Sequence, residues 1–515
     1  MNQNNISATE LFQRVRELLT LPDLEPKTRN KMMHDTLILC CHEGVKDTKQ
    51  AFGNLFSQVD YLCKARGIKV ADKIAIQTMR RHSNSQEPLS GEDLKYDARA
   101  LTLFISAVFE ERIPHEVNVL IPHINRPFQK GLEINNRRIR CIVKNWDSDF
   151  IRVDIDQDAD EEEYLVRLKD EENHIDHTYL WDLLKEGMQL NLLDCQVKQP
   201  IITPRLIVVE PDYLVDISSI ATCFTAFGHH PLLYLLNLMK PRANTQATLL
   251  GNFAGAALDD IINSHGKYQV NETVKSNFRE KALEFCTCPW FDAKKFYTDA
   301  SLQAFNLQQV VDILFPRTAS QAKMSAFRGE SLYDRKKAIL EPSFVCEALG
   351  IQGRVDLMTT DCKLLVEQKS GRNMNIETHQ VDPAYHSYQL EPHYVQLLLY
   401  YGVLQHNFKL SNDRVNIRLL YSKYQPQDGL MVVAYYQKLF KEAIEYRNQL
   451  VAASFEIAKE GFEHTLNEFT PEVLNVAGTQ DFFYNKYLKP QIEAITNPLH
   501  DLSPLEEAYF CRMMT

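Results

Sequence analysis

Residues 343–370 read SFVCEALGIQGRVDLMTTDCKLLVEQKS and contain three short apolar segments. We expect strands at Phe344–Ala348, Gly353–Met358 and Lys363–Lys369, because each segment is short, apolar and bounded by turn residues. A turn at Thr359–Cys362 joins the second and third strands as a hairpin. This hairpin is the centre of the predicted fold.

Polar side chains stand on the last two predicted strands. Asp356 lies in the second strand, and Glu367 and Lys369 end the third. Because side chains alternate along a strand, Glu367 and Lys369 share one face and Gln368 points to the other. Two carboxylates beside an ammonium suit a hard divalent cation. A solvated ion pair is the alternative for Glu-x-Lys alone, but Gly353-x-x-Asp356 at hairpin distance favours a metal site.

These residues carry a resemblance to a known family. Gly353–Asp356 (GRVD) and Glu367–Lys369 (EQK) resemble the catalytic signature of the PD-(D/E)XK nuclease superfamily. The segment HYVQLLLY, from His393 to Tyr400, resembles the Q-x-x-x-Y motif of its RecB-like branch. That branch includes RecB, AddB, the CRISPR-adaptation nucleases and the nuclease half of the replication helicase–nuclease family. The resemblance covers the second half of the chain and implies a metal-dependent deoxyribonuclease in DNA replication or repair.

The resemblance also implies an α/β fold with a restriction-endonuclease-like core of element order αβββαβ. A predicted helix at Thr245–Asn263 precedes the strands, and a helix at Glu391–Leu404 and a strand at Val415–Tyr421 follow them. We therefore place the nuclease domain at residues 216–480. Residues 481–515 are assigned to a C-terminal tail or a linker to a further domain. A long amphipathic helix is predicted at Val432–Lys459.

The same resemblance implies a metal-binding set. Asp356 and Glu367 would hold one or two Mg²⁺ or Mn²⁺ ions, and the backbone carbonyl of Gln368 would add a ligand. Glu341 and Glu347 are both candidates for a further ligand, and the sequence does not choose between them.

Other residues are expected to act on the nucleic acid. Lys369 would orient the attacking water or stabilise developing negative charge. Gln396 and Tyr400 lie one helical turn apart, so they share a helix face. By resemblance, that face points toward the scissile strand. Arg354 and Arg372 flank the motifs and are expected to bind phosphate.

One motif of the family is altered. Relatives usually carry G-x-x-x-H on the helix before the strands, with the histidine as a metal ligand. Here Gly251 and Gly255 occupy the two motif positions. The alternative function is therefore a catalytically decayed nuclease that binds DNA within a larger assembly. The presence of Asp356, Glu367 and Lys369 together favours an active enzyme.

Two further properties follow from missing motifs. Iron–sulfur relatives place one cysteine before the nuclease core and three after it, whereas only Cys511 follows Tyr400, so Cys223 is expected to bind no iron–sulfur cluster. The chain also has no G-x-x-x-x-G-K-[ST] motif. A helicase motor is therefore expected in a longer polypeptide or as a separate partner.

The region before the nuclease divides into two parts. Residues 1–125 show helical periodicity, and residues 126–215 show strand periodicity. The order of three strands, a helix and two strands predicts an OB-like β-barrel, a common single-strand binder, so single-stranded DNA is the expected substrate. The predicted strands are Ile139–Lys144, Phe150–Ile155, Tyr164–Leu168, Leu190–Cys195 and Leu206–Val209, with the helix between Asp176 and Gly187.

Composition sets outer limits on function. The 515 residues carry a net charge of −11, which argues against general adhesion to nucleic acid but is compatible with a local basic groove. No apolar run approaches the length of a membrane span, and MNQNNISATELFQ lacks the features of a secretory signal. Eleven scattered cysteines suit a reducing compartment. We expect a cytoplasmic protein without a membrane partner.

Overall fold

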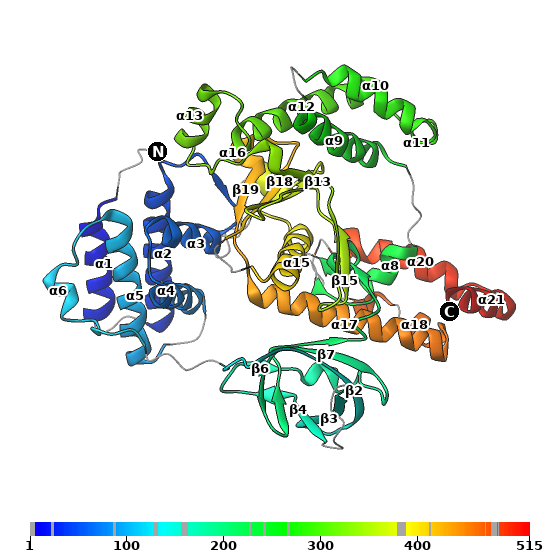
Figure 1. The fold of residues 1–515 in the computed structure, drawn as a ribbon, viewed down its shortest axis with the longest axis horizontal. Coiled ribbons are helices and arrows are strands. Elements are labelled where there is room, and N and C mark those ends of the chain that lie inside the picture. Colours follow the sequence, from blue (N-terminus) through cyan, green and yellow to red (C-terminus); the bar gives the residue numbers. More distant parts are fainter. Residues whose placement is uncertain are drawn as a thin grey trace.

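The protein is a mixed α/β structure of three parts: N-terminal helices, a closed five-stranded β-barrel, and a six-stranded sheet with helices on both faces (Figure 1). A computed structural model is the basis of the description. It describes residues 6–21, 25–85, 89–126, 132–155, 163–225, 228–239, 244–264, 268–378, 388–410, 414–468, 470–474, 482 and 484–515.

The N-terminal helices form their own apolar core. Ser7 caps the first helix, because its side chain accepts the backbone N–H of Glu10 while the Glu10 carboxylate accepts the N–H of Ser7. Leu11, Val15 and Leu18 are buried at helical spacing, as their sequence pattern predicts. The helices are α1 (Ala8–Thr20), α2 (Pro26–Val45), α3 (Leu55–Ala65), α4 (Val70–Ser83), α5 (Gly91–Phe109) and α6 (His115–Asn118).

The predicted barrel is present and closes on itself. Its strands follow the order β2-β3-β4-β8-β7, and pairing of β2 with β7 completes the ring. β4 and β8 run parallel, and the other neighbours run antiparallel. The strands are β2 (Asn136–Trp146), β3 (Phe150–Ile155), β4 (Tyr164–Arg167), β7 (Gln189–Lys198) and β8 (Ile201–Thr203).

Two details of the predicted barrel are wrong. The fifth strand is β8, whereas Leu206–Val209 forms β9, which pairs with β7 outside the ring. β9 is buried along its whole length because it lies between β7 and helix α17 (Gln437–Glu460), so its apolar run did not identify a barrel strand. The predicted helix is one 3₁₀ turn, Thr178–Leu180. The Asp176 carboxylate accepts the N–H of Thr178 and favours this turn.

The central sheet has the order β1-β19-β18-β17-β16-β13. β17 and β18 are parallel neighbours joined by a crossover through helix α15 (Glu391–Phe408), and the pairs β13–β16, β16–β17 and β18–β19 are antiparallel. The strands are β1 (Ala51–Phe52), β13 (Ala338–Leu340), β16 (Leu357–Thr359), β17 (Leu364–Lys369), β18 (Asn416–Tyr421) and β19 (Leu430–Val433).

Two pairs of helices cover the sheet. α9 (Gln246–Asn263) and α12 (Ala293–Leu314) pack against the face that carries Leu364, Val366 and Leu420. α15 (Glu391–Phe408) and α17 (Gln437–Glu460) pack against the opposite face. The helices predicted at Thr245–Asn263 and Glu391–Leu404 correspond to α9 and α15.

β16 and β17 pair antiparallel and form the hairpin predicted around Thr359–Cys362. A second hairpin, which precedes it and shares β16, is bent, with β13 and β14 (Ser343–Cys346) on one side and β15 (Ile351–Arg354) and β16 on the other. The ladder crosses the bend, because the Glu341 N–H donates to the Asp356 carbonyl at 3.0 Å and the Val355 N–H donates to the Pro342 carbonyl at 3.3 Å. Asp356 therefore lies in the bend between β15 and β16, and the prediction that it lies within a strand is wrong.

Other segments join the parts together. β1 comes from the N-terminal region and pairs in parallel with β19. β10 (Val215–Asp216) follows the barrel and pairs in parallel with β15. The first residues of the helix predicted at Val432–Lys459 belong to β19, and the helix itself, α17, begins at Gln437.

The C-terminal residues pack on the rest of the protein. α20 (Lys489–His500) and α21 (Pro504–Met514) contribute to an apolar core with α8 (Leu233–Met239) and the end of α17. Within the described part of the chain, no helix is both long enough and apolar enough to cross a membrane. The remaining helices include α7 (Ile217–Ala221), α10 (Val270–Glu280), α11 (Ala282–Cys286), α13 (Ala319–Phe327), α16 (Pro426–Gly429), α18 (Glu463–Glu468) and α19 (Pro471–Leu474).

Candidate active site

The structure brings the predicted acidic and basic residues together beside α15. Glu367 is 5% exposed on β17, and Lys369 stands two residues further along the same strand face. The Lys369 Nζ donates to Glu367 Oε1 at 2.7 Å and to Gln396 Oε1 at 2.6 Å. The ammonium therefore bridges the sheet and the helix that were predicted to form the site.

The Asp356 carboxylate is fixed by the backbone of the neighbouring strand. β16 and β17 pair through Leu357 with Val366 and through Met358 with Leu365. Beyond this ladder, Asp356 Oδ2 accepts the Gln368 N–H at 2.6 Å. Burial raises the pKa of Asp356, while this hydrogen bond and Lys369 act in the opposite direction.

The Glu367 carboxylate is the most constrained acid of the site. Burial, together with the negative charge of Asp356, raises the pKa of Glu367 to about 7, against the opposing effect of Lys369. Its Oε2 atom is buried without a hydrogen-bond partner among the described residues. An anionic oxygen removed from water without a partner is unfavourable, so this atom can accept a cation.

The protein supplies few side-chain ligands for that cation. Within the described ranges, no group of three or more His, Cys, Asp and Glu side chains is placed to hold a metal ion. The predicted donors are Asp356, Glu367 and the backbone carbonyl of Gln368. This set of hard oxygen donors fits Mg²⁺ or Mn²⁺ that keeps water ligands.

Gln368 points away from the carboxylates, as strand alternation predicts. Its Nε2 donates to Ser422 Oγ at 2.8 Å, and Ser422 Oγ donates to Gln303 Oε1 at 2.7 Å. Gln303 Nε2 then donates to the Ser370 carbonyl at 3.1 Å. This buried polar network connects β17 and β18 to α12 and fixes the strand that carries Glu367.

Tyr400 supports the bend of the hairpin. Its hydroxyl donates to the Arg354 carbonyl at 2.7 Å. A Cβ atom on Gly353 would lie 3.0 Å from both the Tyr400 ring and its hydroxyl, so a glycine is needed at this contact. Burial raises the pKa of Tyr400, and the neighbouring carboxylates of Glu367 and Asp356 raise it further. The described geometry gives Tyr400 a positioning role.

Helix α9 passes beside the site. A Cβ atom on Gly251 would lie 3.1 Å from Ser370 Oγ, so the helix is in close contact there, whereas a Cβ atom on Gly255 would meet open space. Asp259 lies one turn further along α9. Burial and neighbouring carboxylates, among them Asp356, raise the pKa of Asp259 to about 6. Its helical spacing from Gly255 was the available signal.

The two candidates for a further ligand occupy different places. Glu341 lies in the bend, where its backbone pairs with Asp356, and its carboxylate contacts Arg354 at 3.0 Å. Glu347 lies exposed in the turn at the opposite end of the hairpin. Only Glu341 is therefore next to the predicted metal ligands.

Both predicted phosphate-binding arginines are surface residues with carboxylate partners. The Arg354 side chain is 61% exposed and pairs with Glu341. The Arg372 side chain is 62% exposed and pairs with Glu377. Sequence reasoning identified the cations but not these partners.

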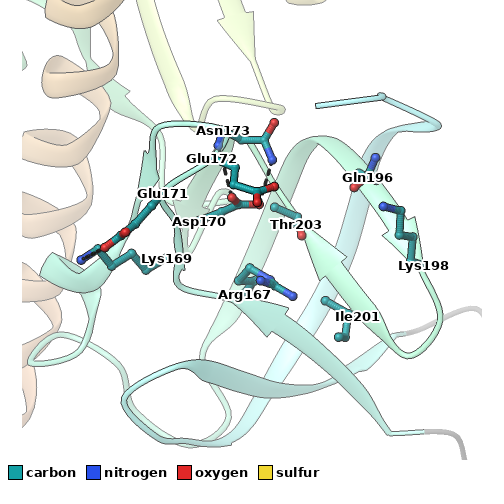
Figure 2. A pocket seen from close by; sticks show the side chains of 10 residues that line it. All are labelled: Arg167, Lys169, Asp170, Glu171, Glu172, Asn173, Gln196, Lys198, Ile201 and Thr203. Atoms are coloured by element: carbon teal, nitrogen blue, oxygen red, sulfur yellow. Dashed lines mark hydrogen bonds and ion pairs between the residues drawn. The ribbon is translucent and has the colours of Figure 1, made fainter. Parts of the chain in front are cut away.

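The barrel carries two separate hollows. The first, of about 420 Å³, is lined by strand residues of β4, β7 and β8 and by the loop around Asn173 (Figure 2). Its charged side chains include three cations and three carboxylates, so it offers no net attraction to phosphate. These side chains are Arg167, Lys169, Lys198, Asp170, Glu171 and Glu172.

The second hollow has a different charge. It has a volume of about 560 Å³ and is lined by Arg138, Arg140 and Tyr164, with no acidic side chain among its described lining residues. Arg140 also donates to Asp212 at 3.1 Å, outside that lining. The barrel aromatics Trp146 and Phe150 are half-buried and are not among the described lining residues of this hollow, and the Trp146 Nε1 donates to the Trp181 carbonyl at 3.1 Å.

The cysteines do not gather at the site. All eleven are free thiols. Cys223 is buried, and its Sγ donates to the Pro231 carbonyl at 3.7 Å, whereas Cys511 belongs to the separate C-terminal core. The position of Cys223 is thus explained by packing.

Comparison of the sequence with protein-family models and with curated proteins found no match. The functional argument therefore depends on the site itself. Its chemically useful features are one orphaned anionic oxygen on Glu367, a second fixed carboxylate on Asp356, and an ammonium on Lys369 held between a strand and a helix.

Proposed function

We propose that this chain is a metal-dependent deoxyribonuclease that hydrolyses phosphodiester bonds and prefers single-stranded DNA. The observation that carries the proposal is the buried, unpartnered Oε2 of Glu367, next to Asp356 and to the Lys369 ammonium. A carboxylate in this state favours a bound cation, and a nearby ammonium favours an anionic substrate.

Each residue has a distinct role in the proposed reaction. Asp356 and Glu367 would hold Mg²⁺ or Mn²⁺ with the Gln368 carbonyl, and such an ion polarises a phosphoryl oxygen and makes water a better nucleophile at neutral pH. Lys369 stabilises negative charge that develops on the phosphate. Gln396 accepts a hydrogen bond from Lys369 and thereby orients its ammonium.

The arrangement of elements supports an assignment to the PD-(D/E)XK superfamily, RecB-like branch. Helix α9, the bent hairpin with β17, helix α15 and strand β18 follow one another in the order αβββαβ. Glu367 lies on β17 and Gln396 and Tyr400 lie on α15, the elements expected for these residues, whereas Asp356 lies in the bend before β16.

The barrel supports single-stranded DNA as the substrate class. Its strand order is that of a five-stranded Greek-key barrel of the OB type, which commonly binds single strands. The hollow lined by Arg138, Arg140 and Tyr164 combines positive charge with an aromatic ring. The proposed context is a helicase–nuclease of DNA replication or repair whose motor is supplied by a longer chain or a partner.

Cleavage of a labelled single-stranded oligonucleotide tests the proposal. The wild-type chain should cut it with Mg²⁺ or Mn²⁺ and without ATP. Asp356→Asn, Glu367→Gln and Lys369→Met should each lower the rate by at least about 100-fold, and the double variants should lose little more, because residues that act as one unit do not contribute additively. Glu272→Gln on the exposed side of α10 is the control and should cut at the wild-type rate.

Two outcomes separate the proposal from its alternative. Near wild-type cleavage by folded Glu367→Gln protein would refute the assigned site. Tight binding of the oligonucleotide with no cleavage in either metal would instead support a decayed nuclease that acts as a DNA-binding module. Circular dichroism of each variant establishes that it is folded.

A further inference from the structure

A group of basic side chains lies at the carboxyl ends of β17 and β18, beside the proposed catalytic residues. β17 and β18 are parallel, and Lys369 pairs in register with Tyr421. The segments that follow these strands therefore leave the sheet side by side, at the carboxyl ends of the two strands. Arg372 follows β17, and Lys423 and Tyr424 follow β18.

All three side chains converge on one carboxylate. Glu377 belongs to the short helix α14 (Met374–Thr378), and its Oε1 accepts hydrogen bonds from Lys423 Nζ and from the Tyr424 hydroxyl, each at 2.9 Å. Its Oε2 accepts a hydrogen bond from Arg372 Nε. The hydrogen bonds from Lys423 and Arg372 lower the pKa of Glu377 to about 2, so this carboxylate is ionised at neutral pH.

One donor of this group, Tyr424, is also held by the backbone of Asn373. The Tyr424 hydroxyl accepts the Asn373 N–H at 2.8 Å, which orients it independently of Glu377. The side chains of Arg372 and Lys423 remain 62% and 40% exposed, so a ligand can reach them from solvent. Two cations against one carboxylate leave an excess of one positive charge.

We propose that Arg372, Lys423 and Tyr424 form a clamp for a backbone phosphate of a nucleic-acid strand, and that the Glu377 carboxylate occupies this clamp in the free protein. A phosphodiester carries one negative charge and two free oxygen atoms, so it can accept the same charge-assisted hydrogen bonds as the carboxylate. When a nucleic-acid strand binds, its phosphate takes the place of the Glu377 carboxylate. The inference rests on the proposed function, because it places the nucleic-acid strand at the carboxyl end of β17, where Lys369 lies.

Binding without cleavage tests the clamp. Fluorescence anisotropy of a labelled 20-nucleotide oligothymidylate measures affinity, and EDTA in the buffer removes divalent metal so that no cleavage occurs. Glu377→Gln should bind about 3- to 10-fold more tightly than wild type, because the internal competitor loses its charge. Lys423→Met should bind about 10-fold more weakly, and the slope of log K against log salt should fall by about 0.7 for one lost phosphate contact on a single strand.

Matched controls remove the effect of net charge. Glu272 and Lys275 form an exposed pair at 2.9 Å on α10, so Glu272→Gln and Lys275→Met change the same charges away from the clamp. The gain in oligonucleotide affinity from Glu377→Gln should exceed the gain from Glu272→Gln. It should also shrink in the double variant Glu377→Gln/Lys423→Met, because Lys423 is one of the donors that Glu377 occupies.

The outcomes distinguish the clamp from the chemistry. Equal affinities for Glu377→Gln and Glu272→Gln, an unchanged salt slope for Lys423→Met, or no binding by any variant would overturn the clamp, even if metal-dependent cleavage is observed. A tighter Glu377→Gln complex with loss of the gain in the double variant supports the clamp, even if no cleavage is found. Circular dichroism of the variants verifies that each is folded.

Discussion

Ser422 shows how one side chain supports the candidate site from behind. Its hydroxyl accepts from Gln368 and donates to Gln303, and all three side chains are at most 9% exposed. Gln368 lies between Glu367 and Lys369 in the strand. The network therefore fixes the backbone from which both functional side chains extend to the opposite face.

Ser422→Ala should lower the free energy of unfolding by about 1–3 kcal/mol, because it leaves buried polar atoms of Gln303 and Gln368 without a partner. Urea unfolding followed by circular dichroism measures the change. Ser276→Ala is the matched control, because the Ser276 hydroxyl donates to Glu280 on the exposed side of α10. A loss no larger than that of Ser276→Ala would show that water replaces the hydroxyl.

Strand alternation was sufficient to predict which residues share a face at the site. It correctly separated Gln368 from Glu367 and Lys369. It could not reveal Ser422 or Glu377 as partners, since these come from other segments that meet the strand only in the folded protein. A local sequence pattern predicts which way side chains point along one element, whereas their hydrogen-bond partners depend on tertiary packing.

At the level of elements, His229 connects two helices that cover the sheet. Its Nε2 lies 3.0 Å from the Glu391 carboxylate at the start of α15, and its Nδ1 lies 2.6 Å from Glu442 on α17. The neighbouring His230 accepts the Leu232 N–H at 3.1 Å near the start of α8. His229 therefore joins α15 to α17, and His230 supports the chain that leads into α8.

The His229 contacts predict a pH-dependent stability. Burial opposes its positive charge, but hydrogen bonds with Glu391 and Glu442 outweigh burial and raise the pKa of His229 to about 9. Since this value exceeds the ordinary pKa of 6.5, the contribution is fully present below pH 6.5 and is lost as pH rises through about 9. Thermal melts of His229→Gln should therefore approach those of wild type at alkaline pH.

A control isolates this effect from general alkaline destabilisation. His464 on α18 is 69% exposed and lies 3.7 Å from Glu468, so His464→Gln should leave the pH profile of the melting temperature unchanged. A constant difference between wild type and His229→Gln from pH 6 to pH 9.5 would contradict the assigned ion pairs.

Hydrophobic periodicity in the sequence predicted whole helices and strands better than the bends and breaks within them. α9, α15 and β18 occur where the patterns indicated, because each has one or two well-defined buried faces. The bend at Asp356 was missed because the hairpin remains hydrogen bonded across it, so the apolar pattern continues. The helix expected after Asp176 was wrong because a side-chain hydrogen bond to Thr178 favours a single turn.

At the level of the whole molecule, Arg447 on α17 connects the barrel to the part of the protein that contains the central sheet. It is fully buried and donates to the carbonyls of Val209, Glu210 and Tyr213, which follow the barrel, and to that of Gly350 in the hairpin turn. A Cβ atom on Gly350 would lie 2.3 Å from the guanidinium, and its φ of +61° also favours glycine.

Arg447→Met should weaken this attachment, because it leaves several buried carbonyl groups without donors. Unfolding should begin at a lower urea concentration, with a loss of about 3 kcal/mol or more. Trp146 and Trp181 belong to the barrel region, and Trp290 is 98% exposed, so tryptophan fluorescence reports mainly on the barrel. We expect the fluorescence and circular dichroism transitions to coincide in wild type and to separate in Arg447→Met.

Arg66→Met is the control for that experiment. Arg66 forms an ion pair with the exposed Glu110 in the N-terminal region, far from the barrel attachment. Its removal should change stability by no more than about 0.5 kcal/mol and should leave the two transitions coincident. Coincident transitions in Arg447→Met would show that other contacts suffice to join the parts.

The pairing of β1 with β19 also orders events during synthesis of the chain. Ala51 pairs with Met431 and Phe52 with Val432, so one edge of the sheet needs two segments made far apart in time. At about 5–20 residues per second, a ribosome takes roughly 20–75 s to make the intervening chain. The N-terminal helices can fold during that interval, whereas β1 waits for its partner. The central sheet is therefore completed only after Met431 and Val432 have been synthesised.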